Sequence, residues 1–504
     1  MKKTISLLWA CLLISLVTFA QIPRDKIISS AQKALPGSIQ QLNAFLSIPN
    51  NGRVESDRQQ NVEWCLAEFA KLGYQTEVLL SDGIPHVLAQ KNYGKSLKTV
   101  LFYMQIDGQP VDSSEWYQPS PYIPVVKEEQ GGEWEIISPD LKGAINPDWR
   151  IYARSASDSK GPSMALITAL QILQEQKKKP AYNIKVIMDF QEEMGSPTLP
   201  KLVEAKREAF AADMMLIMDG TRHLSNLPTL TFGARGIATI TLKVFGARDN
   251  LHSGQYGNFA PNPVFGLSRL LAGMKDEQGR VLIPGYYDGV VLSDSDKRAI
   301  AAMPEDMEEI MQTLGIAEAE QVGPNYGEAL QYPSLNVRGL RAAWVGNEVR
   351  TLVPSEAIAE IDMRLVTETP AERMISLVRK YIEDAGYHII QGEPTEEERL
   401  TYPKLISFSS RIGSRPFRTD MDSDIGMWLG SAMEHLYDDQ YVKMRTTGGS
   451  QPIAPFITTL DIPAVSIRIP NPDNSIHAPN ENIRIGNYLE GIQMCLSILT
   501  QPFN

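Results

Sequence analysis

Acidic residues and one histidine stand at the ends of segments that resemble buried strands. Apolar runs at 99–104, 183–190, 213–219 and 464–470 are typical of such strands. The polar residues at or just after their ends are Asp107, Glu192, Glu193, Asp219 and His477, and Asp158 precedes a predicted helix. Because ligands of open parallel sheets bind beyond the carboxyl ends of the strands, we expect these side chains to converge.

A cluster of carboxylates with an imidazole suits a divalent cation. Close like charges repel, and one or two Zn²⁺ or Mn²⁺ ions would remove that repulsion while accepting carboxylate and imidazole ligands. Of two adjacent glutamates, one can bind metal while the other acts as general base toward a metal-activated water. Each acid taken alone could instead be a turn residue or a helix cap, as Asp158 could be for a helix beginning near Pro162.

The elements that position these residues alternate between strands and helices. A helical pattern runs from about Ile27 to Leu72 and ends at Gly73. With the strands, it predicts an α/β fold with a mostly parallel sheet flanked by helices. The runs at 236–246 and 356–366 alternate between apolar and polar residues, as half-buried strands do. They predict a smaller α+β domain inserted into the first.

The N-terminus has the pattern of a secretory signal peptide. Two lysines precede an apolar run too short to span a membrane comfortably, and Thr18 and Ala20 precede a plausible cleavage site. The alternative is a retained membrane anchor. We expect a secreted or periplasmic protein with no membrane association after cleavage. The expected division is a signal peptide at 1–20, catalytic segments at 21–230 and 406–504, and the inserted domain at 231–405.

Composition narrows the classes of partner. The chain has 504 residues, 43% hydrophobic and 21% charged, with a net charge of −12. It has no basic block or basic–aromatic stripe, so we expect no nucleic-acid partner. After signal cleavage Cys65 and Cys495 remain in apolar helical runs. We expect buried free thiols rather than the one disulfide that an exported protein could form.

Six blocks of the sequence resemble motifs of the co-catalytic zinc exopeptidases, which include aminoacylases, bacterial glutamate carboxypeptidases and carnosinase-type dipeptidases. The blocks are YARSASDSKGP, QEEMGSP, FGARGIATITLKV with DNLHSGQYG, VRTLVPSEAIAEIDMRLV, TTGGSQPI and IHAPNENI. The similarity is strongest to the carnosinase-like dipeptidases, whose motifs include D-D-K-G-P and a G-G-S-I-P loop. The resemblance implies a catalytic α/β domain with an inserted lid that forms a homodimer.

The resemblance also implies a set of metal ligands. Asp158 would bridge two ions, Glu193 and His477 would complete one site, and Asp219 would belong to the other. In the family motif G-H-x-D-x-x-P a histidine ligand stands where this chain has Gln105. A glutamine carbonyl is a weak, neutral donor that is uncommon on zinc. The first site could be filled, with Gln105, Asp158 and Asp219 as ligands, or empty, leaving a single ion.

Catalytic and substrate-binding roles follow from the same resemblance. Glu192 would be the general base, and Asp107 would orient a neighbouring ligand. A histidine from the partner's lid would stabilise the oxyanion, while an arginine and a glycine-rich loop would hold the substrate's terminal carboxylate. The implied substrate-binding residues are His252, Thr351, Arg364, Gly448, Gly449 and Ser450.

The expected function is that of a metal-dependent exopeptidase that hydrolyses dipeptides or short peptides with one or two Zn²⁺ or Mn²⁺ ions. An N-acyl amino acid amidohydrolase would use the same clamp. A catalytically impaired peptide-binding protein is the third alternative, raised by Gln105. Because Glu192 and the clamp residues are present, we favour a working hydrolase.

Overall fold

An eight-stranded sheet carries the polar residues at its strand ends. The computed structural model describes residues 21–141 and 143–503, so the predicted signal peptide lies outside the described residues. The strand order is β1-β2-β7-β3-β8-β20-β9-β19. Its centre is parallel and consists of β7 (Asn183–Asp189), β3 (Thr99–Gln105), β8 (Met214–Ile217) and β20 (Ala464–Arg468). The predicted α/β class is confirmed.

The edges of this sheet are partly antiparallel. On one side β1 (Gln75–Ser81) and β2 (Ile84–Lys91) form a hairpin, and β2 pairs antiparallel with β7. On the other side β9 (Thr229–Thr231) pairs antiparallel with β20 and parallel with β19 (Val442–Met444). None of these edge strands is an unbroken apolar run like those that identified the central strands, and β9 and β19 have only three residues each.

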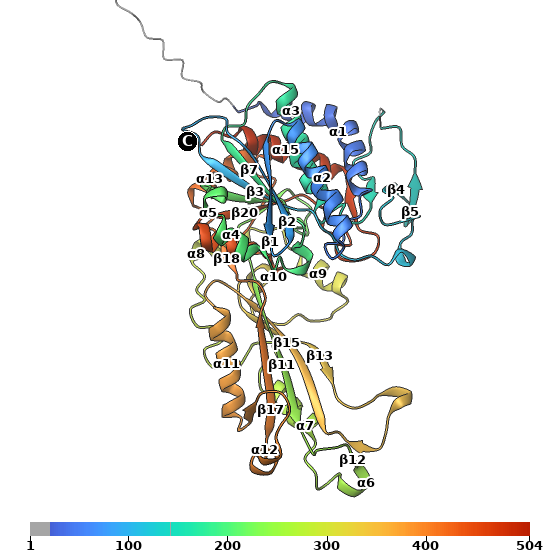
Figure 1. Cartoon of the computed structure of the whole chain (residues 1–504), viewed down its shortest axis with the longest axis vertical. Coiled ribbons are helices and arrows are strands. Elements are labelled where there is room, and N and C mark those ends of the chain that lie inside the picture. The colour runs from blue at the N-terminus through green and yellow to red at the C-terminus, as the bar shows by residue number, and fades with distance from the viewer. Residues whose placement is uncertain (1–20, 142, 504) are drawn as a thin grey trace, which may run out of the picture.

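Helices cover both faces of the sheet (Figure 1). Along β3, Val100, Phe102 and Met104 face one hydrophobic cluster, and Leu101 and Tyr103 face another, which explains the unbroken apolar run. The helices in the first cluster are α1 (Arg24–Leu46), α2 (Glu55–Lys71), α3 (Lys160–Glu175), α13 (Asp424–Tyr437) and α15 (Ile485–Thr500). Those in the second are α4 (Leu199–Ala205), α5 (Arg207–Phe210) and α14 (Ala454–Leu460).

The helical pattern predicted from Ile27 to Leu72 is two helices rather than one. α1 ends at Leu46 and α2 begins at Glu55. Pro49 lies between them and disfavours helical backbone at the residue before it. No helix in the described ranges has both the length and the hydropathy needed to cross a bilayer.

A small second sheet joins two loops that the sequence separates widely. Its order is β21-β6-β4-β5, formed by β21 (Asn482–Arg484), β6 (Arg150–Tyr152), β4 (Val125–Gln130) and β5 (Glu133–Ile137). The antiparallel pair β6–β21 sets Tyr152 opposite Asn482. The chain before Asp158 and the chain after His477 are therefore held side by side.

The inserted domain projects from the catalytic domain as a long arm (Figure 1). Its five-stranded sheet has the order β13-β15-β11-β17-β16, with β13 (Ser334–Arg341), β15 (Glu356–Leu365), β11 (Gly236–Phe245), β17 (Leu405–Ile412) and β16 (His388–Ile390). Helices α7 (Pro263–Ala272) and α11 (Ala371–Asp384) pack on the buried face. Because β17 pairs with β11, this sheet extends past residue 405, where we expected the insertion to end.

The remaining elements are short. They are η1 (Ser113–Glu115), η2 (Glu192–Met194), β10 (Gly233–Ala234), β12 (Leu251–His252), α6 (Ser253–Tyr256), α8 (Asp294–Ala301), α9 (Met307–Leu314), α10 (Tyr326–Ala329), η3 (Gly346–Glu348), β14 (Leu352–Val353), α12 (Glu396–Thr401) and β18 (Phe417–Arg418). Of these, η2 matters most for function, since it carries both adjacent glutamates.

Candidate metal centre

Three of the predicted ligands form a compact group at the carboxyl ends of the central strands. The ligand atoms of Asp158, Glu193 and His477 all lie within 4.8 Å of one another. Nε2 of His477 is 3.0 Å from Oδ2 of Asp158 and 3.2 Å from Oε2 of Glu193. Two carboxylates and one imidazole are a donor set that suits Zn²⁺, which takes nitrogen and oxygen ligands in tetrahedral sites. The residues present therefore fit one such ion.

The electrostatics of this group also favour a cation. Burial raises the pKa of Asp158 well above its usual value, and the nearby Glu193 and Asp219 carboxylates raise it further. The hydrogen bonds to Asp158 and Glu193 raise the pKa of His477 to about 10. A protonated His477 thus compensates the two carboxylates, and a bound metal ion would displace that proton.

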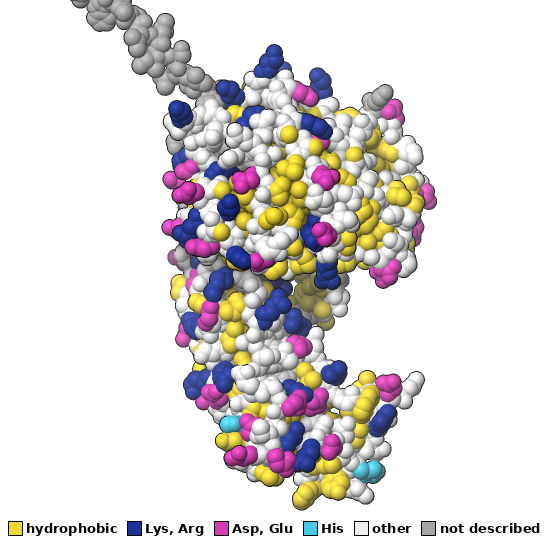
Figure 2. Space-filling view, viewed as in Figure 1, with side chains coloured by type: hydrophobic (Ala, Val, Ile, Leu, Met, Phe, Trp, Pro, Cys, Tyr) yellow, Lys and Arg dark blue, Asp and Glu magenta, His cyan; other side chains and the backbone are white. Residues whose placement is uncertain are grey.

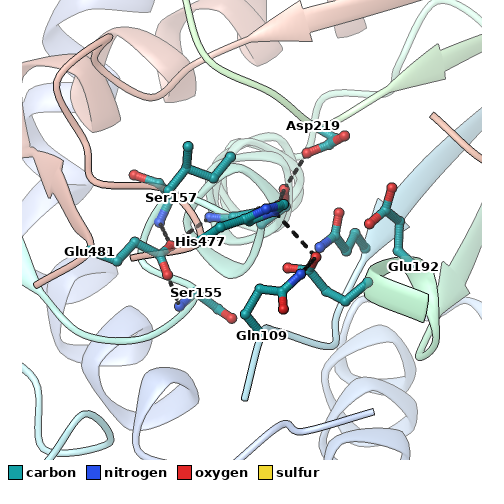
Figure 3. Close-up of polar contacts among 12 residues, drawn as sticks. Gln109, Ser155, Ser157, Glu192, Asp219, His477 and Glu481 are labelled. Atoms are coloured by element: carbon teal, nitrogen blue, oxygen red, sulfur yellow. Dashed lines mark hydrogen bonds and ion pairs between the residues drawn. The ribbon is translucent and has the colours of Figure 1, made fainter. Parts of the chain in front are cut away.

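Glu192 lies beside this group in the same cavity. Burial, followed by the Asp219 and Asp158 charges, raises the pKa of its carboxyl group. Its carboxylate makes no hydrogen bond or ion pair with any residue in the described part of the chain. In Figure 3 the His477 ring lies between Glu192 on one side and Glu481 on the other. Among the described residues, Glu192 is therefore not held in place by a structural ion pair.

Asp107 fixes the backbone that presents the two glutamates. Its Oδ1 accepts from the Glu192 amide at 2.9 Å and its Oδ2 from the Glu193 amide at 3.2 Å. Its carboxylate is therefore used to orient the η2 turn, which is the supporting kind of role that the resemblance implied. A second buried acid, Asp189, holds the start of the same turn through the Gln191 amide, at 3.0 Å.

Glu481 is a functional residue that our sequence interpretation missed. It is fully buried and accepts the backbone amides of Ser155, Ser157 and Asp158 at 2.8, 2.9 and 2.9 Å (Figure 3). It also pairs with Arg154 at 2.8 Å. Glu481 thereby holds the Asp158 loop against the His477 loop. The available signal was its place in the IHAPNENI block, four residues after the histidine ligand.

Asp219 lies next to the group but has other partners. Its Oδ1 accepts from the Ser159 hydroxyl at 2.7 Å, and its Oδ2 accepts from the Gln451 amide at 2.7 Å. Gln105, the last residue of β3, is 1% exposed and donates to the Asp107 carbonyl at 3.5 Å. Asp219 and Gln105 both line the central cavity, but neither belongs to the compact group.

A buried arginine enters the same cavity beside Asp219. Arg468 ends β20 and is 5% exposed, and its Nε donates to Thr231 at 3.3 Å. Its Nη2 is buried and has no hydrogen-bond partner among the residues that the structure describes. The guanidinium packs directly on Gly220, where an added Cβ would lie 1.2 Å from Nη1. Gly220 also has a φ of +94°, so glycine is needed there both for the backbone and for the space that Arg468 occupies.

Replacing Gly220 with alanine should therefore destabilise the catalytic domain more than replacing Gly195, which also has a positive φ but has open space where a Cβ would stand. Left-handed backbone alone should cost Gly195→Ala about 1–2 kcal/mol. Gly220→Ala adds the clash with Arg468. Urea denaturation of both variants checks this, and equal losses would show that Arg468 does not need the space.

The cavity that contains the group runs between the catalytic domain and the base of the lid. It has a volume of about 1140 Å³ and is lined by Gly448, Gly449 and Ser450 as well as by the metal group. Arg364 on β15 donates to the Ser450 hydroxyl at 3.0 Å. The glycine-rich loop and the arginine that the resemblance assigned to carboxylate binding are thus in contact with each other.

Two of the predicted substrate-binding residues lie elsewhere in this chain. His252 is exposed in β12 and Thr351 is exposed beside it, at the far end of the lid (Figure 1). Neither lines the cavity. Nδ1 of His252 accepts from the Gly254 amide at 3.1 Å, which leaves its other ring nitrogen available. Within a single chain the lid does not bring these residues to the metal group.

Comparison with known proteins agrees with this geometry. Residues 101–501 match Peptidase family M20/M25/M40. The chain is 26% identical over 419 residues to human Beta-Ala-His dipeptidase, covering 81% of this chain and 76% of that protein. It is 26% identical over 491 residues to the Cys-Gly metallodipeptidase of Schizosaccharomyces pombe, covering 93% and 96%.

Solved structures give the same result. An M20 family metallo-carboxypeptidase from Sulfolobus solfataricus superposes with a TM-score of 0.75 at 27% identity, covering 92% of this chain and 98% of that one. Fold and site together define a metal-dependent peptidase with a lid domain. The chain belongs to Peptidase family M20/M25/M40.

Proposed function

We propose that this protein is a dipeptidase that uses Glu192 as general base next to a metal ion held by Asp158, Glu193 and His477. The observation that carries the proposal is the compact ligand group beside an unpaired glutamate in a large cavity. The loop Gly448–Ser450 lines the same cavity, and Ser450 accepts a hydrogen bond from Arg364. The names of the human and S. pombe relatives, both dipeptidases, support the choice of substrate class.

Each part of the chain has a defined task in peptide hydrolysis. A bound metal ion would polarise the water and the scissile carbonyl as a Lewis acid. Glu192 takes a proton from the attacking water and delivers it to the leaving amine. Asp107 and Glu481 hold the backbone of the η2 turn and of the Asp158 loop, so these side chains keep their positions.

The clamp accounts for exopeptidase rather than endopeptidase activity. The Arg364 guanidinium donates at 3.0 Å to the hydroxyl of Ser450, which lines the cavity. Arg235, whose side chain also reaches this region, donates to the Tyr332 carbonyl at 2.8 Å. A guanidinium binds a carboxylate bidentately, which selects a substrate that ends in a free carboxylate close to the scissile bond.

The test is a panel of dipeptides and N-acetyl amino acids with the zinc-loaded protein. We expect dipeptides to be hydrolysed faster, since the relatives are dipeptidases. Hydrolysis of N-acetyl amino acids alone would instead establish an N-acyl amino acid amidohydrolase, which the same clamp would serve. Turnover of neither class would remove the proposed function.

We further propose that the working enzyme is a homodimer in which the partner's lid supplies His252. The proposal is supported by exposed hydrophobic side chains at the far end of the lid, including Phe259 at 87%, Val345 at 83% and Val349 at 68% exposure. Hydrophobic side chains are visible there in Figure 2. Contiguous exposed apolar residues mark interaction sites on soluble proteins.

A mixing experiment tests the supply of His252 in trans. His252→Ala should lower kcat about 10²–10³-fold through loss of an oxyanion donor, while His388→Ala, elsewhere on the lid, should not. Unfolded and refolded together, His252→Ala and Glu192→Gln chains should regain activity, because one site in each mixed dimer then has both groups. No regain in mixed dimers, verified by sedimentation, would exclude the trans arrangement.

We propose that the protein is secreted or periplasmic, on the basis of the signal-like pattern at 1–20. N-terminal sequencing of the protein recovered from its native host should begin at Gln21. A protein that retains residues 1–20 would instead be anchored or exported by another route.

A further inference from the structure

The surroundings of Asp219 differ from those of the other acids in the cavity. Each of its oxygens accepts a hydrogen bond from a neutral side chain, Ser159 or Gln451, at 2.7 Å. The ligand atoms of Asp158 and Glu193 instead face His477. Asp158 and Glu193 also accept from neutral donors, Ser159 at 3.2 Å and Gln109 at 2.6 Å. What distinguishes Asp219 is that both of its oxygens have neutral donors and neither pairs with the His477 imidazole, which Asp158 and Glu193 share.

A fixed positive charge stands beside Asp219. Arg468 packs on Gly220, the residue after Asp219, and carries a buried Nη2 with no hydrogen-bond partner in the described residues. An arginine is always charged, and an unpartnered guanidinium nitrogen is costly to bury unless its charge is compensated. The Asp219 and Asp158 carboxylates are the charges that act favourably on it.

The donor set on this side of the cavity is poor for a second zinc ion. Gln105 offers at most a neutral amide oxygen, a weak zinc ligand. The two side chains that donate to Asp219 are also positions at which this chain departs from the family motifs. Ser159 replaces the second aspartate of D-D-K-G-P, and Gln451 replaces the isoleucine of G-G-S-I-P. The changes concentrate around Asp219 and leave the Asp158–Glu193–His477 group intact.

We propose that this peptidase binds one metal ion, on Asp158, Glu193 and His477, and that Arg468 supplies beside Asp219 the positive charge that a second ion would otherwise supply. This inference rests on the proposed function for its catalytic meaning, but its metal stoichiometry is independent of activity. Arg468 is a positioning and charge-compensating residue. The side chains of Gln105, Ser159 and Gln451, which stand on the same side of the cavity, are neutral and add no charge of their own.

The primary test is metal content. The full-length mature protein, saturated with zinc and then dialysed, should contain one ion per chain by elemental analysis, and calorimetric titration of the metal-free protein should show one tight site. Two tight sites of similar affinity would overturn the proposal. If one ion is bound but no peptide is hydrolysed, the proposed function fails and the stoichiometric inference stands.

Two matched double variants test the part assigned to Arg468. Gln105→His with Arg468→Met provides an imidazole and removes the charge, so it should bind two zinc ions per chain. Gln105→His with Arg468→Lys provides the same imidazole but retains a charge, so it should bind one. A folded Gln105→His/Arg468→Met protein that still binds one ion would overturn the proposal.

The single variants separate charge from packing. If charge matters, Arg468→Lys should keep kcat within about tenfold of the parent, while Arg468→Met should lose about 10²–10³-fold, as removal of an electrostatic stabiliser does. Equal losses in both variants, with both proteins folded, would show that only the shape of Arg468 matters and would contradict its role as a charge.

Discussion

Glu192→Gln should lower kcat for dipeptide hydrolysis by about 10²–10⁴-fold, the contribution of a positioned general base, while leaving zinc bound. The glutamine keeps the size of the side chain but cannot accept the proton of the attacking water. Because the Glu192 carboxylate has no partner in the described part of the chain, the substitution breaks no ion pair or side-chain hydrogen bond. Steady-state kinetics and metal analysis measure the two effects separately.

The adjacent residue provides the control. Glu193 contacts His477 at 3.2 Å and accepts from the Gln109 amide at 2.6 Å, so Glu193→Gln should reduce zinc affinity and thereby activity. Added zinc should restore part of the activity of Glu193→Gln and none of that of Glu192→Gln. If Glu192→Gln retained full kcat, Glu192 could not be the general base.

The second large effect is expected at Glu481. Glu481→Gln should lower the free energy of unfolding of the catalytic domain by about 3–5 kcal/mol, as when one partner of a buried ion pair is removed. It leaves Arg154 buried and unpaired, and a glutamine amide nitrogen would face backbone N–H groups that now meet a carboxylate. Because those amides belong to the Asp158 loop, zinc affinity should fall as well.

A more exposed pair in the same region shows whether burial is the cause. Asp148 pairs with Arg484 at 3.3 Å, and the two side chains are 75% and 29% exposed, so Asp148→Asn should cost about 0–1 kcal/mol. Arg154→Met combined with Glu481→Gln should recover part of the loss, since the uncompensated charge is gone. A Glu481→Gln protein as stable as the parent would contradict the structural role of this residue.

The sequence predicted the central strands and the residues at their ends because both signals are local. Continuous apolar runs identified β3, β7, β8 and β20, and the rule that ligands bind beyond parallel strand ends then placed Asp107, Glu192, Asp219 and His477 near one another. Strict alternation identified β11 and β15 of the inserted domain. The edge strands β9 and β19 were missed, since three residues are too few to show a period.

Other parts of the site depend on contacts that no local pattern records. From the sequence alone, Glu481 cannot be distinguished from an exposed surface acid. Its burial under the Asp158 loop depends on the pairing of β6 with β21. In the sequence Arg468 is indistinguishable from an exposed strand residue, and its burial becomes apparent only when β20 is paired with β8 on one side and β9 on the other. The sequence did single out Gln105 as the departure, but the hydrogen bonds from Ser159 and Gln451 to Asp219 required the structure.

The most direct test of the account is removal and return of zinc during dipeptide hydrolysis. The purified protein should hydrolyse at least one dipeptide, lose that activity when a chelator removes its metal, and regain it when zinc is returned. His477→Ala should stay inactive through the same cycle at zinc concentrations that restore the parent. Dipeptide hydrolysis that survives complete removal of metal would contradict the account, as would its absence from the fully zinc-loaded protein.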